Sequence, residues 1–143
     1  MSATSLYLDT SAWVKLYVAE AESLAVRKHV GRSAWVAISR VGYAEARAAF
    51  ARRGREGHLR PAQLRRCVTR LDEDWKHMVV VELDASLSRA AGELAERHAL
   101  RGFDAIHLAS AMRLGMELGT TPTFLAFDAA LRAAGSSEGL HVP

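Results

Sequence analysis

The sequence has few of the features on which secreted or membrane proteins depend. Cys67 is the only cysteine in 143 residues, so no disulfide can form within the chain. No uncharged run approaches the roughly 20 apolar residues that a membrane-spanning helix needs. The first apolar segment contains Asp9 and Lys15 and has no basic lead-in, unlike a secretion signal. We therefore expect a protein of the reducing cytoplasm with no membrane partner.

The chain also lacks a strong excess of either charge. Its net charge is only +3, which permits a polyanionic partner but does not by itself indicate one. Internal repeats and low-complexity segments are missing, and half of the residues are hydrophobic. This length and composition predict one domain with a single sizeable core rather than two domains.

Apolar runs and amphipathic segments alternate along the chain. We predict strands at 5–8, 34–38, 79–83 and 123–127, with a short edge strand at 140–142. We predict helices at 12–18, 21–30, 41–53, 61–77, from 84 or 86 to about 99, 103–116 and 129–134. Gly31 is expected to end the second helix and Ser39 to cap the third. The helices at 41–53 and 61–77 should form a helical hairpin over about 40–77.

The strands are continuous apolar runs separated by helices, which is the pattern of a parallel sheet covered on both faces. The fold class is therefore α/β: a three-layer α/β/α sandwich around a central, mainly parallel sheet of four to five strands. In such sheets, ligands bind beyond the carboxyl ends of the strands. Asp9 and Asp128 each follow a predicted strand directly, so we expect both at this functional edge.

Each candidate acid also has a simpler explanation. Asp9 and Asp128 are well placed to cap the helices that follow them, and Asp104 stands at the start of the helix at 103–116 within a segment that we expect to be largely buried. Glu45 lies in the small apolar stripe of its helix, where an unpaired carboxylate is costly. It therefore needs a cation, and an ion pair with a nearby arginine is the alternative to a metal ion.

The acids mean more together than singly, because carboxylates that share a pocket repel one another unless a cation is present. Oxygen ligands favour a hard divalent ion, Mg²⁺ or Mn²⁺. The six histidines are scattered, and no cluster of histidine and cysteine has the spacing of a zinc site. His107 stands one turn after Asp104; it can support a ligand, but helix packing is the simpler interpretation.

Four short segments resemble the signature of PIN-domain ribonucleases in order and spacing: LDTSA at 8–12, YAEAR at 43–47, FDAIHLA at 103–109 and FDAAL at 127–131. The first and third together are similar to the VapC toxins of bacterial toxin–antitoxin pairs, and the resemblance covers nearly the whole chain. It implies one PIN domain over residues 1–143 with endoribonuclease activity that depends on Mg²⁺ or Mn²⁺. It also implies an RNA substrate, a VapB-like antitoxin as partner, and a homodimer.

The resemblance carries over to individual positions. Asp9, Glu45, Asp104 and Asp128 match the acidic quartet of the family, which holds the metal, and Ser11 matches the hydroxyl that follows the first acid. Ala126 is a departure, because family members often have Thr two residues before the last acid. This difference bears on water positioning or on a second metal site at that side.

The predicted hairpin is rich in arginine. Glu56 is the only acid between Arg47 and Asp72, an excess of positive charge that suits phosphate contacts. The candidates for RNA binding are Arg47, Arg52, Arg53, Arg65 and Arg66. A solvated hairpin, or contact with a second copy or an antitoxin, explains the same arginines equally well.

The predicted chemistry is hydrolysis of RNA by metal-activated water, which leaves 5′-phosphate and 3′-hydroxyl ends. One alternative is a non-catalytic PIN-fold module that binds RNA or protein, with the acids serving only as helix caps. Another is phosphotransfer through Asp9 as nucleophile, which the sequence supports poorly because no second acid lies two residues further on. Trp13, Trp35 and Trp75 are expected to pack in the core rather than stack on bases.

Overall fold

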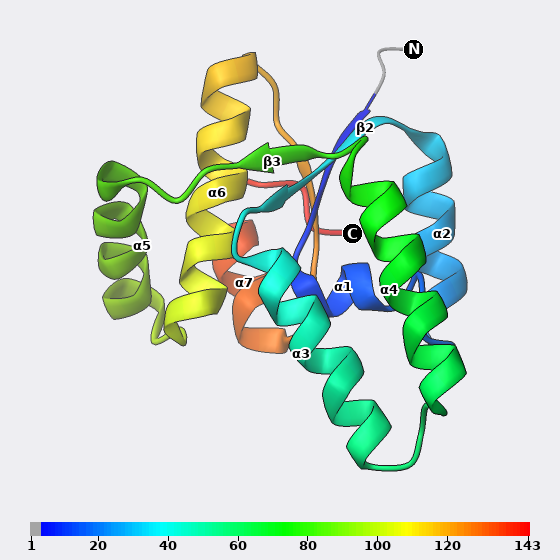
Figure 1. Cartoon of the computed structure of the whole chain (residues 1–143). Helices are drawn as coiled ribbons and strands as arrows, with labels where there is room; N and C mark the ends of the chain where they lie inside the picture. Colours follow the sequence, from blue (N-terminus) through cyan, green and yellow to red (C-terminus); the bar gives the residue numbers. More distant parts are fainter. Residues whose placement is uncertain (1–3) are drawn as a thin grey trace.

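The computed structural model describes residues 4–143, in which helices and strands alternate (Figure 1). In chain order the elements are β1 (Thr4–Leu8), α1 (Thr10–Val14), α2 (Ser23–Arg32), β2 (Ser33–Ser39), α3 (Gly42–Arg55), α4 (Pro61–Trp75), β3 (Val79–Val81), α5 (Ala85–His98), α6 (Gly102–Leu118), β4 (Thr123–Leu125) and α7 (Ala129–Ser137). Within this part of the chain, no helix has both the length and the apolar character needed to cross a membrane.

The strands form one sheet in the order β3-β2-β1-β4, and every neighbouring pair is parallel. Parallel neighbours need a crossover connection, and helices provide it between each pair of consecutive strands. The parallel α/β class predicted from the apolar runs is confirmed. All four strands therefore end at the same edge of the sheet, where the chain turns toward the helices that follow.

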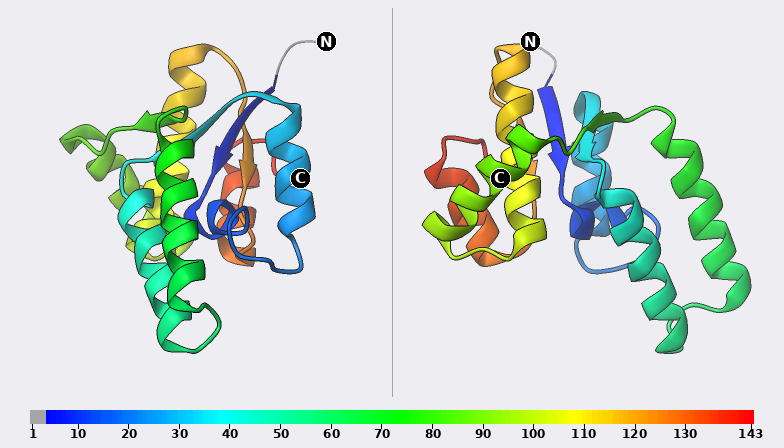
Figure 2. Two further views of the ribbon diagram at one scale, coloured as in Figure 1. Left: turned by 45° about the vertical axis from the view of Figure 1, so that its right-hand side comes forward. Right: turned by 60° about the vertical axis from the view of Figure 1, so that its left-hand side comes forward.

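Helices cover both faces of the sheet, as the right-hand view of Figure 2 shows. Tyr7 points into a core packed by α5, α6 and α7, whereas its neighbours Leu6 and Leu8 point into a second core packed by α1 to α4. This alternation follows from the two-residue period of a strand. The sandwich thus has three layers, with β1 buried at its centre.

The predicted edge strand at 140–142 is wrong. In this segment only His141 bridges to Thr123, although Phe124 N–H donates a hydrogen bond to the carbonyl of His141 at 2.8 Å. One bridge does not make a ladder, so the sheet has four strands. The apolar pattern identified a segment that packs beside β4 but could not show how many backbone pairs it would form.

Several helix ends also differ from the prediction. The first helix ends at Val14 rather than at 18, because the next residues form tight turns in which Leu16 and Tyr17 donate to carbonyls three residues back. Gly31 does not end α2, which continues to Arg32. Ser39 is not the cap of α3, because the cap position is Val41, although the Ser39 hydroxyl accepts a hydrogen bond from the Val41 N–H.

The long helices α3 and α4 run side by side and project from the body of the molecule as a hairpin (Figure 1). Pro61 occupies the first turn of α4, as expected for a residue without a backbone N–H. Gly42 lets α3 begin against β2, because a Cβ atom there would lie 2.6 Å from Cδ1 of Ile38. This close start places Glu45, one turn further on, beside the end of the sheet.

Candidate active site

The four predicted acids line one cavity at the carboxyl edge of the sheet, with a volume of about 420 Å³. They come from four parts of the fold. Asp9 directly follows β1, Asp128 lies just beyond β4, Glu45 belongs to α3, and Asp104 lies in the first turn of α6. Ser11 lines the same cavity. The rule that ligands bind beyond the carboxyl ends of parallel strands placed Asp9 and Asp128 at this edge, and the docking of α3 and α6 adds Glu45 and Asp104.

Asp9 is the most deeply buried of the acids, with 4% of its surface exposed. Its Oδ1 atom accepts hydrogen bonds from the Ala12 N–H and the Ser11 hydroxyl, both at 2.9 Å, so it does cap α1. Burial raises the pKa of Asp9 above its usual value and outweighs the opposing effects of His107 and of the bonds from Ala12 and Ser11, while the negative charge of Asp104 raises the pKa further. Asp9 is thus a helix cap and, at the same time, a carboxylate with too little compensating charge.

Asp128 also caps a helix, because its Oδ2 atom accepts a hydrogen bond from the Leu131 N–H at 3.0 Å. Asp104 does not. The cap position of α6 is Arg101, and Asp104 instead pairs with the Arg101 guanidinium at 3.2 Å. Its segment is largely buried, as expected, with Ala105 and Leu108 fully buried, although Phe103 is 56% exposed. The cap explanation therefore fails for one of the three aspartates.

Glu45 is held by Thr10 and His107 rather than by an arginine, the alternative partner that the sequence left open. Its Oε1 atom accepts a hydrogen bond from the Thr10 hydroxyl at 2.7 Å and lies 2.8 Å from Nε2 of His107. Burial alone would raise the pKa of Glu45, but the bonds from His107 and Thr10 outweigh it, and the pKa lies below its usual value. One carboxylate oxygen is thus occupied by the protein, and no hydrogen bond engages Oε2 within residues 4–143.

His107 has more partners than the sequence indicated, because helix packing was the simpler interpretation and the structure shows side-chain contacts at both ring nitrogens. It is only 1% exposed, and its Nδ1 atom lies 2.7 Å from the hydroxyl of Tyr7, a residue two places before Asp9. The Tyr7 hydroxyl accepts a hydrogen bond from the Ser39 N–H at 3.0 Å. The one-turn spacing from Asp104 was the only signal in the sequence, because Tyr7 lies 100 residues away along the chain.

Two basic side chains at the rim of the cavity, Lys15 and Arg53, share one acidic partner. Lys15 lies 2.6 Å from Glu20 and 3.4 Å from Glu22, and Arg53 also pairs with Glu20. The Lys15 ammonium is 5.0 Å from the centre of the Phe127 ring. Sequence reasoning missed Lys15 and Glu20; their one visible signal was a lysine within an apolar helical pattern.

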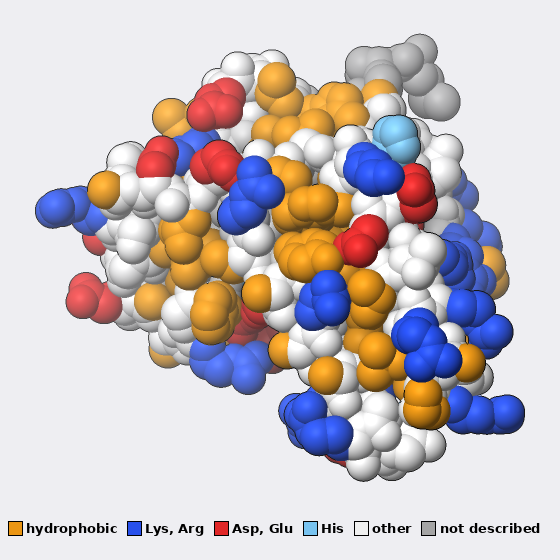
Figure 3. Space-filling model, in the orientation of Figure 1, with side chains coloured by type: hydrophobic (Ala, Val, Ile, Leu, Met, Phe, Trp, Pro, Cys, Tyr) orange, Lys and Arg blue, Asp and Glu red, His pale blue; other side chains and the backbone are white. Residues whose placement is uncertain are grey.

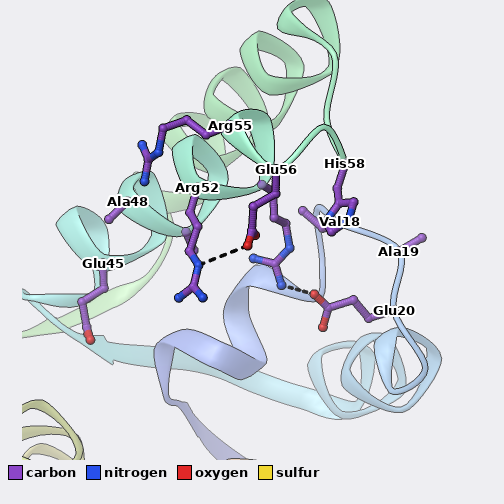
Figure 4. Close-up of a pocket in the computed structure, with 11 residues that line it drawn as sticks. Val18, Ala19, Glu20, Glu45, Ala48, Arg52, Arg55, Glu56 and His58 are labelled. Carbon is purple, nitrogen blue, oxygen red and sulfur yellow. Dashed lines mark hydrogen bonds and ion pairs between the residues drawn. The ribbon is translucent and has the colours of Figure 1, made fainter.

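A broader groove of about 810 Å³ lies next to the acidic cavity and shares Glu20, Glu45 and Arg53 with it (Figure 4). Arg52 and Glu45 reach into this groove from α3, and Glu20 reaches in from the segment after α1. Figure 3 shows how Lys and Arg side chains gather over the hairpin of α3 and α4. Basic charge therefore continues outward from the acids along one side of the molecule.

The five arginines predicted to bind RNA do not share one location. Arg52 and Arg53 line the groove, whereas Arg47, Arg65 and Arg66 line neither hollow. Arg47 folds back on its own helix, where it donates a hydrogen bond to the Tyr43 hydroxyl at 2.9 Å. Only Arg52 and Arg53 are thus placed next to the acids.

As the side chains stand, no three acidic, histidine or cysteine residues among residues 4–143 are grouped closely enough to hold one metal ion. Asp104 turns to Arg101, Asp128 turns to its helix, and Glu45 turns one oxygen to His107. Carboxylates without a cation between them are expected to turn apart, because their charges repel. The donor set is chemically suited to a hard ion, and side-chain rotation is needed to close it.

The fold and this cavity define a three-layer α/β protein with four carboxylates at the carboxyl edge of a parallel sheet. The chain belongs to the PIN-domain family, whose sequence pattern matches residues 6–135. Ribonucleases of this family generally depend on a divalent metal ion.

Named relatives and solved structures agree with this assignment. The chain is 41% identical to Ribonuclease VapC49 of Mycobacterium tuberculosis over 111 residues, which is 77% of this chain and 76% of that protein. It resembles the crystal structure of VapC20 from the same organism, described as a toxin that cleaves the sarcin–ricin loop, with a TM-score of 0.63, 24% identity and coverage of 91% and 95% of the two chains. It also resembles VapBC2 of Rickettsia felis bound to a promoter DNA fragment, with a TM-score of 0.65, 14% identity and 98% coverage of both chains.

Proposed function

We propose that this protein is a metal-dependent endoribonuclease that hydrolyses RNA phosphodiester bonds, and that it is the toxin of a VapBC-like toxin–antitoxin pair. The observation that carries this proposal is the meeting of Asp9, Glu45, Asp104 and Asp128 at one cavity, although they come from four separate elements. The names of the relatives in Mycobacterium tuberculosis support the same activity.

The four acids would hold Mg²⁺ or Mn²⁺, because oxygen-only ligands suit hard divalent ions. When bound, such an ion supplies an activated water and stabilises charge on the leaving oxygen. The burial-raised pKa of Asp9 supports this assignment, because a deeply buried carboxylate that repels Asp104 is stabilised by a nearby cation. An ordinary helix cap on the surface would be exposed to water and would not have a pKa raised by burial, as Asp9 has.

The chain's own residues prepare the site before any ligand arrives. The Ala12 N–H and the Ser11 hydroxyl fix the Asp9 carboxylate at the start of α1. The contacts of Glu45 with Thr10 and His107 use only Oε1. Asp104 can exchange its ion pair for a ligand at little cost, because its Arg101 partner is 83% exposed, and Asp128 is itself an exposed residue. We therefore assign Asp9 and Glu45 as ligands that are already fixed in place, and Asp104 and Asp128 as ligands that turn toward the ion when it binds.

RNA would approach along the groove of Figure 4, where Arg52 and Arg53 offer phosphate contacts beside the acids. Lys15 adds a third cation at the rim of the acidic cavity. We keep Arg47, Arg65 and Arg66 as weaker candidates, because their positions require a longer stretch of RNA or a partner. Positive charge next to the acids also offsets their repulsion of the phosphate backbone.

We further propose a small VapB-like antitoxin as the partner and a homodimer as the working form, in the cytoplasm where RNA substrates are found. The support for a partner is the likeness to VapBC2 of Rickettsia felis, a toxin–antitoxin complex, together with the VapC names of the relatives. An adjacent short reading frame that encodes a DNA-binding N-terminus would strengthen this part of the proposal.

A non-catalytic binding module is the second candidate. The cap bonds of Asp9 and Asp128 favour it, because each acid has a complete structural role without a metal. This alternative predicts that RNA or protein binding is indifferent to Mg²⁺ and to amide substitution at either position. The enzyme proposal predicts a strong dependence on both.

The direct test uses purified protein and RNA labelled at either end. Internal cleavage is expected with Mg²⁺ or Mn²⁺, and EDTA is expected to stop it. The products should carry 5′-phosphate and 3′-hydroxyl groups, because the attacking group is water rather than the neighbouring 2′-hydroxyl. Products with a 2′,3′-cyclic phosphate would refute this mechanism, and intact RNA with every divalent ion would refute the activity.

Arg52→Gln is expected to weaken binding of a single-stranded RNA and to flatten the dependence of log K on log salt by about 0.7, the value for one lost phosphate contact. Fluorescence anisotropy in EDTA measures binding without cleavage. Arg89→Gln is the matched control, because Arg89 is also exposed on a helix, α5, but lines neither the groove nor the acidic cavity. Equal salt slopes for Arg52→Gln and the unmodified protein would remove Arg52 from the RNA path.

A further inference from the structure

A buried chain of polar contacts links the centre of the sheet to Glu45. It begins at the Ser39 backbone N–H, passes through the Tyr7 hydroxyl and the His107 ring, and ends at Oε1 of Glu45. The three successive distances are 3.0, 2.7 and 2.8 Å. Tyr7 is fully buried and His107 nearly so, which excludes water as an alternative partner for most of this path.

The direction of the hydrogens along the chain follows from the partners of the Tyr7 hydroxyl. The Ser39 N–H can only donate to it, and among residues 4–143 its one other hydrogen-bond partner is Nδ1 of His107, so the Tyr7 O–H is the donor to Nδ1. A neutral imidazole that accepts at Nδ1 carries its hydrogen on Nε2. That hydrogen points at Glu45, whose Oε1 atom lies 2.8 Å away. Tyr7 therefore selects the imidazole form that can donate to the carboxylate.

Any buried histidine needs hydrogen-bond partners, so what distinguishes His107 is the identity of its partners. Its two ring nitrogens contact Tyr7 of β1 and Glu45 of α3, and Glu45 is one of the four acids that line the cavity. Thr10 completes the arrangement, because its hydroxyl donates to the same Oε1 atom and lies 3.1 Å from Nε2. Two donors hold Oε1 in place and leave Oε2 without a hydrogen-bond partner among residues 4–143, so it is available to the cavity that Glu45 lines.

We propose that His107 is a positioning residue that orients Glu45 toward the cavity, and that Tyr7 supports it by fixing the imidazole tautomer. The inference rests on the proposed metal site, since Glu45 is one of its four ligands. Partners that orient a ligand in this way typically change metal affinity by roughly 10- to 100-fold when they are removed. His107 touches neither the metal nor the RNA in this scheme.

The first test is Mn²⁺ binding by isothermal titration calorimetry on metal-free protein. His107→Leu is expected to weaken binding by roughly 10- to 100-fold, and His107→Gln to recover part of the loss, because a glutamine amide can place an N–H near the position of Nε2. Tyr7→Phe removes only the hydroxyl and is expected to weaken binding several-fold. Tyr17→Phe is the matched control: it removes another buried hydroxyl that bonds an acid, Asp74, outside the cavity, and should bind as the unmodified protein does.

The outcomes separate this inference from the proposed function. If the unmodified protein binds no Mn²⁺, the metal site itself is contradicted. If it binds and a folded His107→Leu binds equally well, only the role of His107 is contradicted. A long-range ¹H–¹⁵N spectrum of the unmodified, metal-free protein gives an independent readout that needs no variant. It should show a hydrogen on Nε2 of His107, and a spectrum with Nε2 unprotonated would overturn the proposal.

Discussion

Asp9→Asn is expected to lower the rate of Mg²⁺-dependent RNA cleavage by roughly 10²- to 10⁴-fold, the equivalent of several kcal/mol of lost stabilisation of the transition state. Asparagine keeps an oxygen that can accept the Ala12 N–H bond, so α1 retains its cap. What the variant loses is the negative charge at the most buried of the four acids. Cleavage of end-labelled RNA under single-turnover conditions measures the effect.

The matched control is Asp84→Asn. Asp84 also follows a strand and caps a helix, through a hydrogen bond from the Leu87 N–H at 2.8 Å, but it does not line the acidic cavity. If the acids served only as caps, the two variants would behave alike. Full activity of Asp9→Asn would contradict the assignment of Asp9, and equal loss in Asp84→Asn would show that the cleavage assay reports helix stability rather than chemistry.

The same variant has an expected effect on stability in EDTA. Because burial raises the folded-state pKa of Asp9, the metal-free protein loses stability as pH rises from the unfolded-state pKa to the folded-state one. Asn removes this titration, so Asp9→Asn should unfold at a temperature equal to or above that of the unmodified protein at neutral pH. The difference should shrink toward acidic pH, where Asp9 is protonated. Thermal unfolding across a pH series would show it.

The sequence predicted the layers and the site because both depend on short-range patterns. A strand that is buried on both faces, such as Leu6 to Leu8, is a continuous apolar run, and the polar residue that follows it must lie at the sheet edge. Topology alone predicted this position for Asp9 and Asp128, whereas Glu45 and Asp104 lie in helices and were added by the resemblance to the PIN family. The sequence also allowed Asp9 to be either a helix cap or a site residue. In the structure the Asp9 carboxylate both caps α1 and lines the cavity.

The contacts that sequence reasoning missed connect residues that are far apart in the chain. Periodicity indicates which face of α6 is buried, and so it predicted a packed His107. It does not indicate that Tyr7 of β1 and Glu45 of α3 will meet the two ring nitrogens. Burial of a polar group requires a partner, but the identity of that partner is decided by how the helices dock. The alternative of an arginine partner for Glu45 is not realised in the structure, where Thr10 and His107 bond it instead.

Glu20 pairs with both Lys15 and Arg53 at the rim of the cavity that we propose binds RNA. These ion pairs should stabilise the fold but compete with phosphate for the two cations. Glu20→Gln is expected to lower the free energy of unfolding by about 2 kcal/mol at neutral pH, less than for a fully buried ion pair because the Glu20 side chain is 23% exposed. The same change should strengthen RNA binding several-fold in EDTA, because two cations are released to contact phosphate. Stability and RNA affinity would thus change in opposite directions.

The pH dependence of this effect has a definite sign. Burial alone would raise the pKa of Glu20, but the Lys15 hydrogen bond and the Arg53 charge outweigh it, and the pKa lies below its usual value. The stabilisation is therefore complete above the unfolded-state pKa and is lost as pH falls through the folded-state one. Urea unfolding of the unmodified protein and Glu20→Gln should accordingly converge at low pH.

Glu22→Gln is the comparison that isolates the shared ion pair. Glu22 lies 3.4 Å from Lys15 and is 45% exposed, so its removal should change the free energy of unfolding by no more than about 0.5 kcal/mol. RNA binding by Glu22→Gln should exceed that of the unmodified protein only slightly. If Glu20→Gln instead bound RNA more weakly than Glu22→Gln, then Glu20 would be aligning Lys15 and Arg53 for phosphate rather than competing with it.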